Sequence, residues 1–503
     1  MNMKKILLSS ALFLMGFPLV FSQNQTLQLS VARAYLGVTT FENKIICAGG
    51  ALINDGNSSQ TKYSNIINII DSRTLKTQEL KFPVEQAGLD LLSWNKKLLF
   101  YNSIFQTFGS VTRIDIYDFE NNKWLVKYLS TYYPKVSAVL IENKVFFFNG
   151  ELNYNLPMKN FEVYDLEKNQ WSYIPIPNPR NDIICYSLDK KLYLIGGENP
   201  ISKADLTQIK SKQVDIYDST KGTWETGDPL QSPKSKRSQN SVLMGTKVVF
   251  PDGEIYDLTK KKSVSPPNAI GSNYYSAVAL SGIAYFTGKE MWLSSAQPTD
   301  SIRTYDSNSN TWSYILLPQK RCKVAVFGFD DKIYFAGGFT ENFPGATNVT
   351  DAIDIYNYKM GKWTKQILFE PRALIEPLVI GDKAFLVGGN RSFADLFKGK
   401  YPISFSNPSP TIDILELSTL DPSVKDQLEV FPNPFNSEIT FRWSRKNDVS
   451  GTLKIYNIIG QEVYNSPIEN RQKIVNISHL AIGTYVAYLE TLSGIFTHKI
   501  VKY

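Results

Sequence analysis

The sequence predicts an all-β protein, with a large repeated region followed by a small β-sandwich. Three observations support this prediction. Eight similar units follow one another over residues 23–417, and each contains an apolar strand, a turn and a second strand. Two fixed spacings keep these units in register. The chain is also rich in the aromatic residues that strands favour, with 28 Tyr and 29 Phe among 503 residues.

The clearest unit is residues 332–338, KIYFAGG, followed by residues 353–357, IDIYN, and by Trp363. It predicts an apolar strand that ends at a glycine pair, a loop, a second strand of alternating polarity and a tight turn. Glycine adopts positive φ without a steric penalty, so the chain can turn there. The first strands of the other seven units are residues 45–50, 98–102, 146–150, 193–197, 248–253, 284–288 and 385–389.

Two spacings recur along the repeated region. The step from the end of the second strand to a tryptophan is six residues in five units: 118 to 124, 165 to 171, 218 to 224, 306 to 312 and 357 to 363. The step from an arginine to the first or single glycine is sixteen residues in five units: Arg33 to Gly49, Arg180 to Gly196, Arg237 to Gly253, Arg321 to Gly337 and Arg372 to Gly388. Two independent spacings indicate a true repeat.

This pattern resembles the kelch repeat, in which units of about 50 residues each form one four-stranded blade of a β-propeller. The resemblance covers residues 26–417 and implies a closed ring of blades around a central channel. Eight units favour eight blades, with seven or six as alternatives because units two and five are the least regular. Residues 27–29 lie at the same spacing before Arg33 as residues 366–368 lie before Arg372. We therefore expect the N-terminal segment to be the outer strand of the last blade.

Residues 1–22 predict a secretory signal peptide. Lys4 and Lys5 precede an apolar run over residues 6–21, and Ser22 is a small residue at a suitable cleavage position. No other stretch of the sequence is long and apolar enough to cross a bilayer. We therefore expect an exported mature protein whose propeller spans residues 23–417.

A different kind of unit follows the repeats. Residues 418–427 contain Pro422 and a short polar run, which predicts a linker. Residues 428–503 show alternating strands with turn residues between them, and they predict a small Ig-like β-sandwich. The motifs of this region are VFPNPF at 430–435, LKIYN at 453–457 before Gly460 and Gln461, LAIGTYV at 480–486 and HKIVK at 498–502.

These four motifs, in this order, resemble the C-terminal sorting domain (type A) of the type IX secretion system. The resemblance implies that the signal peptide directs transport across the inner membrane. It also implies that the type IX secretion machinery recognises residues 428–503 for transport across the outer membrane. Such domains are usually cut off afterwards, which leaves the cargo secreted or attached to the cell surface. The alternative is an ordinary Ig-like adhesion domain.

Histidine usage limits the chemistry of the repeated region. The two histidines of the sequence, His479 and His498, both lie in residues 428–503. This leaves no histidine-ligated metal, Ser-His-Asp triad or Cys-His pair for the repeats, and we expect neither a metal nor a cofactor. Some kelch propellers are copper radical oxidases that need histidine ligands, so this class is excluded.

Cysteine and charge usage point to no further chemistry. Cys47, Cys185 and Cys322 fall in units one, four and seven, which places them too far apart for disulfides. We expect three buried free thiols. The formal net charge of +7 comes from cations that are interspersed with acids, which predicts no nucleic-acid surface.

The arginines of the sixteen-residue spacing each precede the expected innermost strand of a blade. In several kelch propellers such arginines bind acidic peptides or sugar carboxylates, because guanidinium matches a carboxylate with two hydrogen bonds. Alternatively they pair with acids such as Asp215 or Asp354 and fix the turns between blades. Three units carry Gln86, Tyr133 and Gly271 instead. The candidate ligand-binding residues at the channel mouth are Arg33, Arg180, Arg237, Arg321 and Arg372.

The loops after the glycine pairs are long and dissimilar, and variable loops on a rigid ring are where recognition usually occurs. They are residues 51–64, 198–213, 339–352 and 390–410. The last contains Phe393, Phe397, Tyr401 and Phe405, which either stack on sugar rings or anchor the loop.

Together these features predict a secreted or surface-delivered binding module for a glycan or a protein. The alternative is a metal-independent carbohydrate enzyme that resembles the kelch sialic-acid mutarotases and epimerases. Such an enzyme needs a carboxylate acid or base aimed into an arginine-lined mouth, whereas a binding module needs only the cations and aromatic residues.

Overall fold

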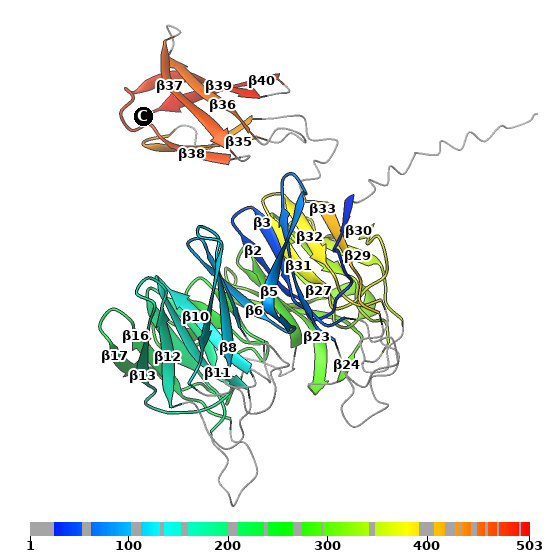
Figure 1. The fold of residues 1–503 in the computed structure, drawn as a ribbon. Coiled ribbons are helices and arrows are strands. Elements are labelled where there is room, and N and C mark those ends of the chain that lie inside the picture. Colours follow the sequence, from blue (N-terminus) through cyan, green and yellow to red (C-terminus); the bar gives the residue numbers. More distant parts are fainter. Residues whose placement is uncertain are drawn as a thin grey trace, which may run out of the picture.

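The structure is a computed structural model that describes residues 25–52, 62–101, 112–130, 135–151, 159–199, 210–235, 240–264, 274–292, 295–341, 348–391, 407–417, 428–431, 435–443, 450–457, 461–469, 472–491 and 494–503. The regular elements of these residues are the strands β1 to β40, with no α-helix among them. The all-β prediction is therefore confirmed (Figure 1). No helix in this part of the chain could span a membrane. The predicted signal peptide and linker lie outside the described residues.

The repeated region forms eight antiparallel sheets, numbered here in chain order. Sheet 1 contains β2 (Gly37–Phe41), β3 (Lys44–Ala48), β4 (Ser64–Asp71) and β5 (Thr77–Gln86). Sheet 2 contains β6 (Asp90–Trp94), β7 (Lys97–Tyr101), β8 (Arg113–Asp118) and β9 (Lys123–Tyr128). Sheet 3 contains β10 (Lys135–Ile141), β11 (Lys144–Glu151), β12 (Asn160–Asp165) and β13 (Gln170–Pro175). Sheet 4 contains β14 (Ile184–Leu188), β15 (Lys191–Ile195), β16 (Val214–Asp218) and β17 (Thr223–Thr226).

The second four sheets follow the same order of strands. Sheet 5 contains β18 (Val242–Met244), β19 (Lys247–Val249), β20 (Ile255–Asp257) and β21 (Lys262–Ser263). Sheet 6 contains β22 (Tyr274–Leu280), β23 (Ile283–Trp292), β24 (Ser295–Gln297), β25 (Thr299–Asp306) and β26 (Thr311–Arg321). Sheet 7 contains β27 (Ala325–Phe329), β28 (Lys332–Ala336), β29 (Ala352–Asn357) and β30 (Lys362–Ile367). Sheet 8 contains β31 (Glu376–Ile380), β32 (Lys383–Val387), β33 (Thr411–Glu416) and β1 (Gln25–Gln28).

The second strand of each sequence unit is the third strand of its sheet, for example β16 in sheet 4. The six-residue spacing reflects the hairpin between this third strand and the fourth strand. In sheet 4, Asp218 ends β16, and its Oδ1 accepts hydrogen bonds from the backbone N–H groups of Thr220 (3.0 Å) and Lys221 (3.1 Å). The acid thereby fixes the turn. Trp224 then lies directly opposite Tyr217 across the hairpin, with ring centroids 5.1 Å apart. Tyr356 and Trp363 repeat this pair in sheet 7.

The N-terminal segment completes the last sheet, as predicted. β1 pairs antiparallel with β33, with Leu27 opposite Ile412. Leu29 follows with a backbone hydrogen bond to the carbonyl of Pro410 (2.8 Å). The first and last parts of the repeated region are thus joined by a sheet, and the blue strands of sheet 1 lie beside the yellow strands of sheet 8 in Figure 1.

Apolar residues pack between consecutive sheets all the way around the repeated region. Eight buried clusters each combine two neighbouring sheets, from sheets 1 and 2 through to sheets 7 and 8, and the last combines sheet 8 with sheet 1. In this last cluster Ile45 and Cys47 lie with Phe385 and Ile412. The first strands also contact each other, and β2 packs against both β6 and β31. This arrangement is consistent with a β-propeller.

The two least regular units also form sheets of their own. Unit two gives the four-stranded sheet 2, and unit five gives sheet 5, whose strands are only two or three residues long. Unit five has almost no loop after Gly253, and the connection there is a tight turn. The N–H of Phe250 donates to the carbonyl of Glu254 (2.9 Å), which lets β19 lead almost directly into β20.

Residues 428–503 have a separate core. One sheet contains β34 (Leu428–Phe431), β35 (Glu438–Trp443) and β38 (Gln472–Asn476). The other contains β37 (Glu462–Glu469), β36 (Ser450–Asn457), β39 (Gly483–Thr491) and β40 (Gly494–Lys502). Their apolar side chains, among them Phe441, Ile455 and Leu489, form one buried cluster without residues of the repeated region.

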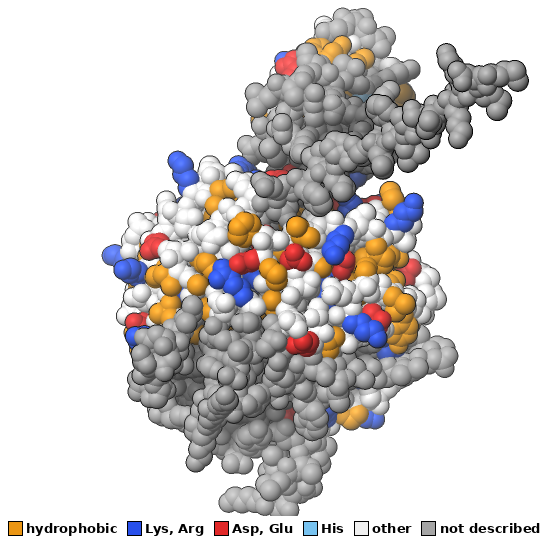
Figure 2. All heavy atoms as spheres, turned by 90° about the vertical axis from the view of Figure 1, so that its right-hand side faces the viewer, with side chains coloured by type: hydrophobic (Ala, Val, Ile, Leu, Met, Phe, Trp, Pro, Cys, Tyr) orange, Lys and Arg blue, Asp and Glu red, His pale blue; other side chains and the backbone are white. Residues whose placement is uncertain are grey.

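The cysteines are free thiols, as predicted. Cys47 and Cys322 are buried, and burial raises the pKa of the Cys47 thiol to about 12. Cys185 departs from the prediction because it is only partly buried and lines a cavity. On the face drawn in Figure 2, basic and acidic side chains are interspersed among apolar ones, in agreement with the charge distribution expected from the sequence.

Candidate functional site

The described arginines of the sixteen-residue spacing lie inside their sheets. Arg33, Arg180, Arg321 and Arg372 are each at most 1% exposed. Arg180 forms an ion pair with Asp215 (2.5 Å), and Arg321 and Arg372 form ion pairs with Asp354 and Asp413. Arg33 donates instead to the side-chain oxygen of Asn68.

The spacing of sixteen follows from a second contact of each guanidinium. Nη1 of Arg33 donates to the carbonyl of Gly49 (2.8 Å), and Nη1 of Arg321 donates to that of Gly337 (2.9 Å). The arginine therefore satisfies the carbonyl that the glycine turn leaves without a strand partner. Burial lowers the pKa of Arg33 to about 10, which still leaves it charged at neutral pH.

The glycine pair also packs against the next sheet. Gly337 has φ +61°, and a Cβ at this position would collide with the carbonyl oxygen of Arg372. The N–H of Gly338 donates to the same carbonyl (2.9 Å). Arg372 thus binds its own glycine turn through the side chain, and its backbone carbonyl receives the glycine turn of sheet 7.

Sheet 5 uses a lysine where the sequence analysis assigned Arg237, which lies outside the described residues. The carbonyl of Lys234 accepts the N–H of Gly197 (2.7 Å), as the carbonyl of Arg372 accepts that of Gly338. The buried Nζ of Lys234 forms ion pairs with Asp252 and Glu254 (2.8 Å to Glu254). Lys234 therefore holds the structural position of the arginine in this sheet.

Most sheets carry an acid three residues before the end of the third strand. In the sheets that lack the arginine, other groups donate hydrogen bonds to this acid. Gln86 donates to Asp115 (2.8 Å), and both the N–H and the hydroxyl of Ser130 donate to Glu162 (2.8 Å each). In sheet 6 the acid position is occupied by a cation, Arg303. Its guanidinium donates to the carbonyl of Pro251 (2.7 Å) and stacks on the ring of Trp312.

These contacts agree with the structural interpretation of the arginines. Their acceptors are carbonyls and acids of the same sheet, and the named pairs with Asp215 and Asp354 are present. A guanidinium held in this way has few donors left for a ligand. None of the four described arginines lines the cavity that the first strands enclose.

That cavity consists of two hollows among the first strands of sheets 2 to 8. One has a volume of about 260 Å³ and is lined by residues of sheets 2 to 5. The other has a volume of about 320 Å³ and is lined by sheets 5 to 8 and the segments that lead into them. Asn240 and Ser241 line both hollows. We refer to the two together as the central cavity.

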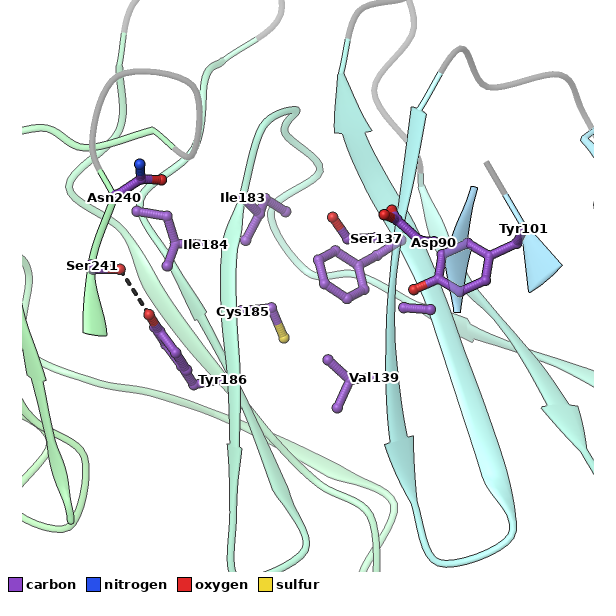
Figure 3. A pocket seen from close by; sticks show the side chains of 12 residues that line it. Asp90, Tyr101, Ser137, Val139, Ile183, Ile184, Cys185, Tyr186, Asn240 and Ser241 are labelled. Atoms are coloured by element: carbon purple, nitrogen blue, oxygen red, sulfur yellow. Dashed lines mark hydrogen bonds between the residues drawn. The ribbon is translucent and has the colours of Figure 1, made fainter. Parts of the chain in front are cut away.

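Polar side chains from several sheets face the first hollow. Figure 3 shows Asp90, Tyr101 and Ser137 grouped on one side of it. Tyr186 lies on the other side, where its hydroxyl is 2.9 Å from that of Ser241. Desolvation raises the pKa of both tyrosines, so they are neutral hydrogen-bonding groups at physiological pH.

Three charged residues of the described part of the chain line the central cavity: Asp90, Glu376 and Lys323. Asp90 begins β6 and Glu376 begins β31, so both lie at the same end of the first strands. Glu376 is exposed toward the cavity, and partial desolvation there raises its pKa, which the charge of Asp90 raises further. Asp90 is therefore close enough for its charge to act on Glu376.

Sequence reasoning did not single out Asp90 and Glu376. A signal was present, because each residue stands immediately before the apolar run of a first strand. Neither belongs to a recognised motif.

The four aromatic residues of loop 390–410 lie outside the described residues. Within the described part of the chain there is no group of three or more His, Cys, Asp or Glu side chains that could hold a metal ion.

Comparison with known proteins gives one finding. No curated protein matches this chain. Residues 429–503 match the family described as the secretion system C-terminal sorting domain. The match covers β34 to β40 apart from Leu428, and so coincides with the separate core described above. The C-terminal part of this protein is therefore a type IX sorting domain, which assigns the chain to export toward the cell surface or the medium.

Proposed function

We propose that this protein is a binding module for a glycan or a protein, exported by type IX secretion and built on an eight-bladed kelch-type propeller. The eight sheets and the eight apolar clusters that connect them in a closed series support the propeller. An experimental structure with six or seven blades would contradict it. The proposed domains are a signal peptide at 1–22, the propeller at 23–417, a linker at 418–427 and the sorting domain at 428–503.

The central cavity is the observation that carries the binding function. Its lining comes from the first strands of sheets 2 to 8 and adjoining segments, and it includes hydroxyl, amide and carboxylate side chains. Ligand sites are typically concave, with a few convergent polar groups on an apolar lining, and this cavity has both. The apolar part of its lining includes Val139, Ile184 and Val326.

A metal-independent carbohydrate enzyme is the second candidate, and Glu376 favours it. A carboxylate with a raised pKa suits general acid catalysis near neutral pH. The mutarotase-like enzymes require arginines at the site, and none of the described arginines lines the cavity. Catalysis would be detected by NMR as faster exchange between sugar anomers on addition of the protein. An unchanged exchange rate would count against this candidate.

The binding function is tested with the purified chain 23–503 on an array of bacterial and host glycans and against extracellular proteins. We expect saturable binding of at least one ligand, and weaker binding after Tyr186→Phe combined with Ser241→Ala, which removes hydroxyls from the cavity. An absence of binding to every glycan and protein would contradict the proposal.

A further inference from the structure

We propose that the central cavity binds a small amino sugar, with its ammonium group at Asp90 and Glu376. This proposal rests on the proposed binding function and specifies its ligand class. It reverses the charge of the ligand that the arginines suggested from the sequence. The argument uses the position of the two carboxylates, the charges of the lining, its hydrogen-bonding groups and its size.

The fold brings the two carboxylates toward one space. Asp90 is the first residue of β6 in sheet 2, and Glu376 is the first residue of β31 in sheet 8. Sheet 1 lies between these sheets, and its first strand β2 contacts both β6 and β31. Gly37 holds the corresponding first position of β2, so no side chain stands between the two acids there.

Gly37 is itself required for this close approach. A Cβ at Gly37 would collide with the side chain of Leu91 and lie within 3.0 Å of the carbonyl oxygen and Cβ of Leu89. β2 and β6 therefore pack as closely as only glycine permits. The effect of Asp90 on the ionisation of Glu376 agrees with this short path across sheet 1.

The charges that line the cavity select a cation. Among the described residues that line the two hollows, Asp90 and Glu376 are acidic and Lys323 is basic, so this described lining has one excess negative charge. Lys323 is only 8% exposed, so it offers little of its surface to a ligand. An anionic sugar would meet two carboxylates that already repel each other. An ammonium group would reduce that repulsion and favour the ionised form of Glu376.

The remaining lining suits a polyhydroxylated ligand. Tyr101, Ser137, Tyr186, Asn240 and Ser241 supply hydroxyl and amide groups that both donate and accept hydrogen bonds. The hollow of about 320 Å³ lies at the lower end of the range for small-ligand sites, and the hollow of about 260 Å³ lies just below that range. This size fits one or two sugar rings, which favours an amino sugar over a folded protein surface.

The test compares three sugars by isothermal titration calorimetry at neutral pH, using the chain 23–503. Glucosamine carries an ammonium group, whereas N-acetylglucosamine and glucose have the same ring without the charge. We expect glucosamine to bind about tenfold or more tightly than either, which corresponds to about 1.4 kcal/mol. Equal affinity for the three sugars would overturn the proposal, and so would no measurable binding of glucosamine.

Variants then locate the site. Asp90→Asn combined with Glu376→Gln should weaken glucosamine binding about tenfold or more and leave binding of N-acetylglucosamine unchanged. Glu120→Gln removes a negative charge at an exposed position and should change neither affinity. Undiminished glucosamine binding by the double variant would overturn the assignment. Circular dichroism establishes that the variants are folded, and Asp90→Asn alone provides a second, milder variant.

Two further outcomes separate this proposal from the general binding function. A lysine-containing tripeptide that binds as tightly as glucosamine, and depends on the same two carboxylates, would overturn the amino-sugar class in favour of a peptide. Binding of a different glycan on the array, unaffected by the Asp90 and Glu376 changes, would overturn this site but leave the general function standing.

Discussion

At the scale of single residues, the same buried arginine ion pair recurs in three sheets. Arg180, Arg321 and Arg372 each join an acid on the third strand to the carbonyl of a glycine turn. Burying a charge is costly unless it is paired and hydrogen-bonded. The pairs therefore specify how each glycine turn sits against its sheet, and removal of one partner leaves the other charge buried and uncompensated.

Replacing Arg372 with Gln should lower the free energy of unfolding by about 3 to 5 kcal/mol, because Asp413 then stays buried without its cation. The matched control is Lys96→Gln, which breaks an exposed ion pair with Glu120 (3.5 Å) and should cost less than about 1 kcal/mol. Urea denaturation measures both. Equal, small effects would show that the buried pair is not a structural requirement, and unchanged ligand binding by folded Arg372→Gln protein is also expected.

Glu376 should make stability depend on pH. Its pKa is raised in the folded protein, so as pH rises from about 4.5 the unfolded chain loses its proton first and stability falls. The penalty is absent at low pH and grows as the pH rises through the folded-state pKa of Glu376. Glu376→Gln should therefore raise the melting temperature at neutral pH and leave it nearly unchanged below pH ~4. A variant that melts lower than the natural protein at neutral pH would contradict this sign.

At the scale of elements, the repeat was predictable because strand, turn and tryptophan recur at fixed steps. The six-residue step is the hairpin that pairs Tyr217 with Trp224, and the sixteen-residue step is the reach of an arginine to its glycine carbonyl. In unit five that step selected Arg237, because the sequence does not reveal that the buried Lys234 holds the equivalent place. Asp90 and Glu376 were missed for a similar reason: their proximity arises across sheets, which no spacing along the chain encodes.

Replacing a glycine of these turns should lower the free energy of unfolding most where the turn packs against the next sheet. Gly337 (φ +61°) and Gly381 (φ +60°) have the same backbone conformation, but a Cβ would collide with the carbonyl of Arg372 only at Gly337, and nothing lies within 4 Å at Gly381. Gly381→Ala should cost about 1 to 2 kcal/mol from the left-handed conformation alone. Gly337→Ala should cost about 1 to 3 kcal/mol more, because it also overpacks the contact with sheet 8. Equal costs in urea denaturation would contradict the proposed packing.

At the scale of the whole molecule, two separately packed parts have separate tasks. The repeated region is held together by clusters that join each sheet to the next and sheet 8 to sheet 1. The core of residues 428–503 shares no residue with those clusters, and it matches the sorting domain family. Removal of the C-terminal domain after transport would therefore leave the core of the repeated region complete.

Export of a truncated chain tests this division most directly. A chain that ends at residue 427 should fold, resist protease and stay in the periplasm, because it lacks the sorting domain that type IX secretion recognises. The control fuses residues 428–503 to an unrelated periplasmic protein, which should then reach the surface or the medium. Cell fractionation and protease accessibility of intact cells measure both. Normal surface delivery of the truncated chain would contradict the assignment of export to residues 428–503.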